Sequence, residues 1–113
     1  MSTARKHAEM NEGPIYKKVS NIKGNLSRLL LELSKSEDIP TLQNKIDQNA
    51  KDLLALVTEN HKSIFKTESY LKNAIIDLTE VPYMQPQMQK IAFEIAIRAS
   101  IKNLGAFLDS TPI

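Results

Sequence analysis

The sequence contains no cysteine, only three glycines and only five prolines. Without cysteine there is no disulfide framework, no thiolate nucleophile and no zinc–cysteine site, and such a composition suits a reducing compartment. So few turn-forming residues do not supply the many turns of a β-sandwich, and no segment alternates between apolar and polar residues over a useful length. No apolar run approaches the roughly 20 residues that span a bilayer. The sequence therefore predicts an all-α protein without direct membrane insertion.

Positive charges also exceed negative charges only slightly. The 113 residues carry a formal net charge of +2, and 42% are hydrophobic and 25% charged, which suits one folded domain. An electrostatic nucleic-acid binder would need a strongly basic face, so we expect no nucleic-acid partner. The first twelve residues lack the apolar centre of a signal peptide, and Ser2 excludes an N-myristoylation motif. We therefore expect a cytoplasmic protein.

The N-terminal part divides into a tail and a helix. Residues 1–14 are polar, lack periodicity and end at Gly13–Pro14, which predicts a disordered tail before one helical domain of residues 15–113. A first helix is predicted over residues 15–35, because its apolar residues recur with the 4-3-4-3-4 spacing of a heptad seam. The seam consists of Ile15, Val19, Ile22, Leu26, Leu29 and Leu33. We interpret it as a candidate protein interface.

A long second helix is predicted over residues 41–81, with Asp38 or Thr41 as its N-cap. A polar face recurs every seven residues, at Lys45, Asp52, Glu59, Lys66, Asn73 and Glu80. The opposite, apolar face carries Ala50, Val57, Ile64, Leu71 and Leu78. Polar residues interrupt this apolar side in the middle, at Asn60, His61, Thr67 and Glu68. His61 and Glu68 are seven residues apart on one face, so they are a candidate buried polar contact, proton-linked switch or partner contact, with a solvated patch as the alternative.

A third helix is predicted over residues 86–108. Pro82 and Pro86 predict a break before it, since proline lacks an amide donor and pushes the preceding residue out of the helical region. Charged residues form a single stripe along this helix, at Lys90, Glu94, Arg98 and Lys102. A helix with so narrow a polar face buries most of its circumference and needs at least two neighbours. Tyr83, Met84 and Met88 are candidate contact residues around the break, with core packing as the alternative.

Two architectures fit these three segments. A continuous helix over residues 41–81 would be about 60 Å long. It would form an elongated, coiled-coil-like rod in which other chains cover the third helix. A break near residues 58–62 would instead give a compact four-helix up-down bundle. We favour the continuous helix, because neither proline nor glycine lies between Thr41 and Val81.

No motif predicts catalysis, a cofactor or a metal. His7 and His61 are the only histidines and belong to no metal-binding helical pair. The glycines are isolated, so no phosphate-binding loop is expected, and no nucleophile elbow surrounds a serine. We expect neither an enzyme nor a small-molecule substrate.

Part of the sequence resembles subunit seven of the BLOC-one-related complex (BORC). The resemblance rests on Ile64-Phe65-Lys66-Thr67-Glu68, Leu71-Lys72, Ala74-Ile75-Ile76, Tyr83-Met84-Gln85 and Gln89-Lys90, with a fainter match at Lys18-Val19. Pro82 and Pro86 depart from the family pattern. The resemblance implies a non-catalytic helical subunit of a hetero-oligomeric complex, held on lysosomal membranes through its partners and coupling them to transport machinery. The alternative hypothesis is a small regulatory or immunity-type bundle, monomeric or homodimeric, that binds and inhibits one protein target.

Overall fold

Helices make up nearly all of the chain. The structure is a computed structural model that describes residues 3–35 and 38–110, with side chains from residue 13 onward. The four helices are α1 (Thr3–Ser34), α2 (Ile39–Ile64), α3 (Glu68–Thr79) and α4 (Pro86–Ser110). The described residues contain no strand, so the all-α prediction is confirmed.

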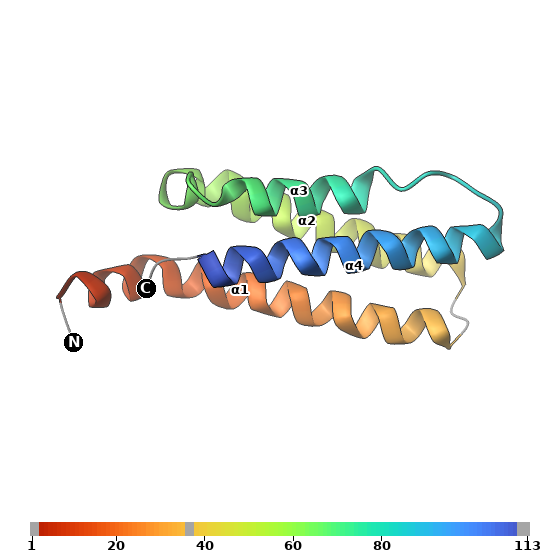
Figure 1. Cartoon of the computed structure of the whole chain (residues 1–113), viewed down its shortest axis with the longest axis horizontal. Helices are drawn as coiled ribbons and strands as arrows, with labels where there is room; N and C mark the ends of the chain where they lie inside the picture. Colours follow the sequence, from red (N-terminus) through yellow and green to blue (C-terminus); the bar gives the residue numbers. More distant parts are fainter. Residues whose placement is uncertain (1–2, 36–37, 111–113) are drawn as a thin grey trace.

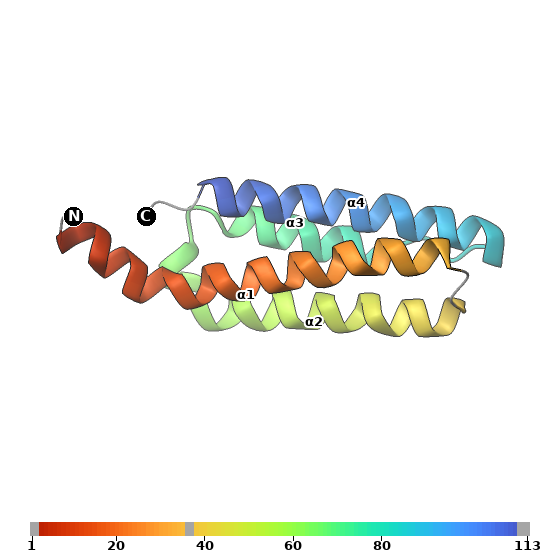
Figure 2. The ribbon, with the colours of Figure 1, turned by 90° about the horizontal axis from the view of Figure 1, so that it is seen from below.

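The helices alternate in direction and form an up-down-up-down bundle (Figure 1). Each helix packs against the one before it in the chain, and α4 also packs against α1, which closes the ring. Seen from below, α1 and α2 lie side by side, and α4 lies along α1 (Figure 2). The molecule measures 53 × 22 × 17 Å. The third predicted helix packs mainly against α3 and α1 and also touches α2, so it has at least two neighbours as expected, but all of them belong to the same chain.

The continuous helix predicted over residues 41–81 is not found. Its sequence forms two antiparallel helices, α2 and α3, joined by residues 65–67. Helical geometry already fails at Asn60, where φ is −122° and ψ is 18°. The Asn60 side-chain amide donates to the Leu56 carbonyl at 2.9 Å, a local bond that competes with regular helix. The backbone N–H of Thr67 then donates to the Ile64 carbonyl at 2.8 Å and closes the turn.

This turn needs neither glycine nor proline. Phe65 and Thr67 keep negative φ angles of −56° and −118°, which any residue adopts at little cost. Folding back at this point leaves the polar residues around 60–68 at one end of the bundle. Ile64, Leu71 and Leu78 then face the same core as the residues of α2. The burial of both apolar halves in one core, rather than a residue that breaks helices, accounts for the position of the turn.

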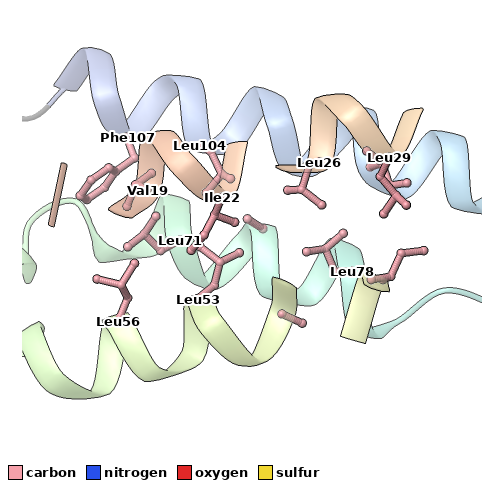
Figure 3. Packing of buried hydrophobic residues seen from close by; sticks show 14 of the residues in the cluster. Val19, Ile22, Leu26, Leu29, Leu53, Leu56, Leu71, Leu78, Leu104 and Phe107 are labelled. Atoms are coloured by element: carbon pink, nitrogen blue, oxygen red, sulfur yellow. The ribbon is translucent and has the colours of Figure 1, made fainter. Parts of the chain in front are cut away.

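All four helices contribute to one hydrophobic core. Figure 3 shows Leu26 of α1 near Leu78 of α3, and Ile22 of α1 near Leu104 of α4. The six α1 seam residues are all buried in this core: Ile15, Val19, Ile22, Leu26, Leu29 and Leu33. The apolar face predicted for the second helix is buried as well, at Ala50, Val57, Ile64, Leu71 and Leu78. Each fully buried aliphatic side chain stabilises the fold by about 1.5–3 kcal/mol relative to exposure.

The helix ends partly match the prediction. Asp38 is the N-cap of α2, and its carboxylate accepts hydrogen bonds from the Thr41 backbone N–H at 3.1 Å and the Thr41 hydroxyl at 2.7 Å. The Thr41 hydroxyl and N–H hold the pKa of Asp38 below its usual range. As predicted, α4 begins at Pro86.

The first helix begins earlier than predicted. It starts at Thr3, inside the segment 1–14 that was expected to be a tail, and it contains Pro14. Proline cannot donate to the carbonyl four residues earlier. Figure 2 shows the N-terminal part of α1 leaving the bundle at an angle. Ile15 is the first buried side chain among those described, so packing into the bundle begins directly after Pro14. Residues 1–2 of the expected tail lie outside the described residues.

Candidate protein-interaction site

Helix α3 spans only part of the length of the bundle. Helix α3 has 12 residues, whereas α2 has 26 and α4 has 25. Beyond α3 the chain continues without helical structure to Pro86, and this segment passes along the end of the bundle where α2 begins (Figure 1). We call residues 80–85 the connecting segment. It occupies the place that a longer α3 would fill, because Pro82 and Pro86 prevent the helix from continuing.

Gln89 holds the connecting segment in place. Its side chain is 3% exposed and lies on the inner side of α4. Its Oε1 accepts a hydrogen bond from the backbone N–H of Met84 at 2.7 Å, and its Nε2 donates to the carbonyl of Pro82 at 3.0 Å. Both backbone groups would otherwise lack a helical partner, so one buried amide replaces the hydrogen bonds that this part of the chain has lost.

The fixed segment presents apolar side chains to the outside. Val81 packs against the core, whereas Tyr83 is fully exposed at 101% and Met84 is also exposed. Tyr16 and Tyr70 are only partly exposed, which sets Tyr83 apart from the other tyrosines. Met88 follows in the first turn of α4 and is exposed too. The three contact residues predicted around the break are therefore at the surface, and core packing of these residues is not found.

A groove lies between the connecting segment and the start of α2. Its volume is about 940 Å³, and its apolar walls include Ile39, Pro40, Tyr83, Met84 and Pro86. We call it the Tyr83 groove. Polar lining comes only from amides, at Gln43, Asn44, Gln85 and Gln89. An apolar floor with a few neutral hydrogen-bonding groups suits a hydrophobic side chain of a partner better than a charged ligand.

His61 and Glu68 meet at the opposite end of the bundle, across the turn between α2 and α3. The Nδ1 atom of His61 lies 2.8 Å from Oε2 of Glu68, and the Lys72 ammonium lies 3.2 Å from Oε1. The hydrogen bond from His61, followed by the Lys72 bond and the charges of both residues, lowers the pKa of the Glu68 carboxyl. His61 and Glu68 therefore make a polar contact, but it lies at the surface rather than buried, since the His61 side chain is 62% exposed. It joins two antiparallel helices rather than two turns of one helix, and its role as a switch or partner contact stays a prediction.

The other residues predicted to lie at a protein interface fall into a buried group and an exposed group. The α1 seam of Ile15 to Leu33 forms core contacts within the chain and is not available at the surface. Among the exposed candidates, Tyr83 and Met84 lie in the connecting segment and Met88 in the first turn of α4, whereas His61 and Glu68 lie on either side of the turn between α2 and α3.

Sequence reasoning missed the residues that shape the groove. Gln89 was a detectable signal, because it stands four residues before Phe93 on the side of α4 that is buried. A glutamine in that position must find hydrogen-bond partners, and backbone groups without a helical partner are expected between Pro82 and Pro86. Ile39 and Pro40 gave no such signal, since their role depends on how the start of α2 meets the connecting segment.

Among the side chains that the structure describes, those of residues 13–35 and 38–110, no group of three histidine or acidic residues is arranged to hold a metal ion. None of the helices described there carries a stretch both long and apolar enough to cross a membrane. Comparison of the chain with known protein families, curated proteins and solved structures finds no match.

Proposed function

We propose that this protein is a non-enzymatic interaction module that binds another protein through the Tyr83 groove. The observation that carries the proposal is the full exposure of Tyr83 on a segment that Gln89 fixes from behind. Exposed apolar side chains on a pre-organised backbone lose little conformational entropy on binding. Tyrosine is also among the residues that contribute most to binding at protein interfaces.

The partner expected at this groove presents an apolar segment, such as one face of an amphipathic helix. Met84 and the rim amides can adapt to its shape and satisfy its polar atoms, because thioether side chains repack easily. Since the groove has no charged lining, the affinity should depend little on salt. Neither a nucleic acid nor a small-molecule substrate is part of the proposal.

The wider role that we propose is that of a subunit in a hetero-oligomeric assembly. The resemblance to subunit seven of BORC supports this role, and the run Tyr83-Met84-Gln85 that carries part of it borders the groove. The protein would then be cytoplasmic and would reach an organelle membrane, such as that of the lysosome, through its partners.

The second candidate is a regulatory or immunity-type bundle that binds and inhibits one target. It is favoured by the closed core, in which the four helices of the chain bury a common set of apolar residues without another subunit. In that case function would be concentrated on one surface, and the Tyr83 groove is the best candidate for it.

Co-purification from cells that express the protein tests both roles. Tyr83→Ala should lose partners that the wild type retains, measured by quantitative mass spectrometry. Leu54→Ala is the matched control, since Leu54 is an exposed apolar residue on α2, outside the groove lining. Loss of several stoichiometric proteins together supports an assembly, and loss of one supports a single target. Identical partner sets for both variants, at unchanged helicity, would refute the groove as the binding site.

A further inference from the structure

Helix α4 carries an exposed apolar stripe that the Tyr83 groove does not include. The stripe consists of Met88, Ile91 and Ile95, spaced three and four residues apart on the outward side of the helix. Ile91 is 55% and Ile95 is 64% exposed, although both lie within one helix of a closed bundle. Ile76 of α3 is exposed beside them, and it lines a shallow hollow of about 260 Å³ together with Ile95 and Ala99. Contiguous exposed apolar residues of this kind mark an interaction surface.

Charges flank the stripe on the side away from α3. Glu94 and Arg98 are both exposed, and the Arg98 Nε lies 3.5 Å from the Glu94 carboxylate. Along the helix the acidic residue comes first, and the basic residue follows one turn later. When two copies of the helix lie antiparallel, the acid of each copy faces the base of the other. The flank is therefore complementary to itself in that orientation.

We propose that two copies of this chain associate through α4, in an antiparallel pair with Ile95 at the two-fold axis. In this register Ile95 meets the Ile95 of the second copy, and Ile91 lies opposite the small residue Ala99 of that copy. Met88 lies against the aliphatic stem of the second copy's Lys102. Glu94 of each copy then reaches Arg98 of the other, which turns two pairs within single helices into a network of four charges. In this register Arg98 of the second copy lies two residues, about 3 Å along the helix, beyond the point opposite Glu94, a distance that these long side chains span. A second copy fits this surface because the apolar contacts and the charge order both favour the antiparallel orientation.

The interface is separate from the proposed partner site. The Tyr83 groove opens between the connecting segment and α2, whereas the stripe lies on the outward side of α4 toward α3. A dimer of this kind would present two grooves, so each assembly would hold two partner segments. Absence of the dimer would leave binding at the groove unaffected, and absence of groove binding would leave the dimer unaffected.

Sedimentation equilibrium of the purified full chain, over micromolar to millimolar concentrations, tests the proposal. The wild type should show a monomer–dimer equilibrium. Ile95→Glu should weaken dimerisation roughly 100-fold, because each dimer loses two apolar contacts and gains two like charges at the axis. Leu31→Glu is the matched control, since Leu31 of α1 is 64% exposed, the same as Ile95, and should dimerise like the wild type. A wild type that stays monomeric throughout, or equal dimerisation of both variants, would overturn the proposal.

Charge exchange tests the antiparallel orientation. Glu94→Lys and Arg98→Glu should each weaken the dimer severalfold, because like charges then face each other across the axis. The double variant Glu94→Lys/Arg98→Glu restores opposite charges and should recover wild-type dimerisation. Failure of the double variant to recover, with helicity unchanged in circular dichroism, would refute the charge pairing.

Disulfide trapping tests the register. The chain has no cysteine of its own, so Ile95→Cys introduces a single thiol at the proposed axis. Two such thiols should oxidise rapidly to a covalent dimer, because only residues close to the axis meet their own copies. Leu31→Cys should cross-link only slowly, through random collisions. Equal rates for the two variants would contradict the proposed axis.

Discussion

The Gln89 side chain holds the backbone of Met84, with its Oε1 accepting the Met84 N–H at 2.7 Å. The same amide donates to the Pro82 carbonyl at 3.0 Å, so one buried residue of α4 fixes both sides of Tyr83. The two prolines stop α3 early, and Gln89 prevents the resulting segment from losing its position. A surface that would otherwise adopt many conformations is thereby presented in one.

Replacing Gln89 should release this segment. Gln89→Leu keeps the approximate volume but removes both hydrogen bonds, and we expect the free energy of unfolding to fall by about 1–3 kcal/mol. The Met84 amide should also exchange with deuterium faster, while core amides of α1 and α2 keep their relative order of protection. Urea unfolding and hydrogen exchange measured by NMR provide the two readouts.

Gln87→Leu is the control for this experiment. Gln87 is an exposed glutamine in the same turn of α4, so its replacement should leave stability and Met84 exchange close to the wild-type values. If Gln89→Leu behaves like Gln87→Leu, the hydrogen bonds of Gln89 do not hold the segment.

A distance measurement can test whether the chain turns back at residues 65–67. Spin labels at Lys51→Cys and Glu80→Cys would be roughly 44 Å apart on a continuous helix at 1.5 Å per residue. In the bundle Lys51 lies on α2 and Glu80 directly follows α3, which runs antiparallel beside α2. The axes of packed helices are about 8–10 Å apart, so the label distance should be well under 30 Å. Double electron–electron resonance distinguishes the two. Labels at Gln48 and Glu59, both within α2, should give the same distance in either case and serve as the control.

The contact between His61 and Glu68 predicts a pH dependence of stability. Because the folded pKa of Glu68 is lowered, its contribution is fully present above the ordinary glutamate value of 4.5 and is lost as the pH falls through the lowered folded value. Glu68→Gln should therefore be less stable than the wild type at pH 6, and this difference should shrink in acid. Urea unfolding at a series of pH values measures it. A difference that stays constant down to pH 2 would show that the contact does not depend on the ionised carboxylate.

Several features of the bundle were readable from the sequence because each follows from local chemistry. The heptad spacing of Ile15 to Leu33 identified the buried side of α1, and Asp38 was among the predicted caps. Pro82 and Pro86 located the break before α4, since proline excludes regular helix for a steric reason. What the α1 seam packs against was not readable, because an apolar seam has the same pattern whether another helix of the chain or another protein covers it.

The turn between α2 and α3 was not the favoured prediction from the sequence, for a different reason. Polar residues at Asn60, His61, Thr67 and Glu68 interrupt the apolar side there, which left a break near residues 58–62 as the alternative. The heptads that begin at Lys45 and Ala50 nevertheless continue in phase beyond residue 67, and this favoured a continuous helix. The turn is made by Phe65, Lys66 and Thr67 with ordinary backbone angles, and only the gain from burying both halves selects it. The Tyr83 groove depends on the same long-range packing, and so only its exposed residues, not its walls, could be predicted.

Direct contact at Tyr83 is the most decisive measurement for the proposed interaction module. A photo-crosslinking amino acid placed at position 83 in cells that express the protein should give a discrete cross-linked product with a partner. The same amino acid at position 54 should give none, although Leu54 is also an exposed apolar residue. A product from position 83 alone, lost on Gln89→Leu, is the result expected if the fixed segment binds a protein. No product from position 83, or equal products from both positions, would contradict that role.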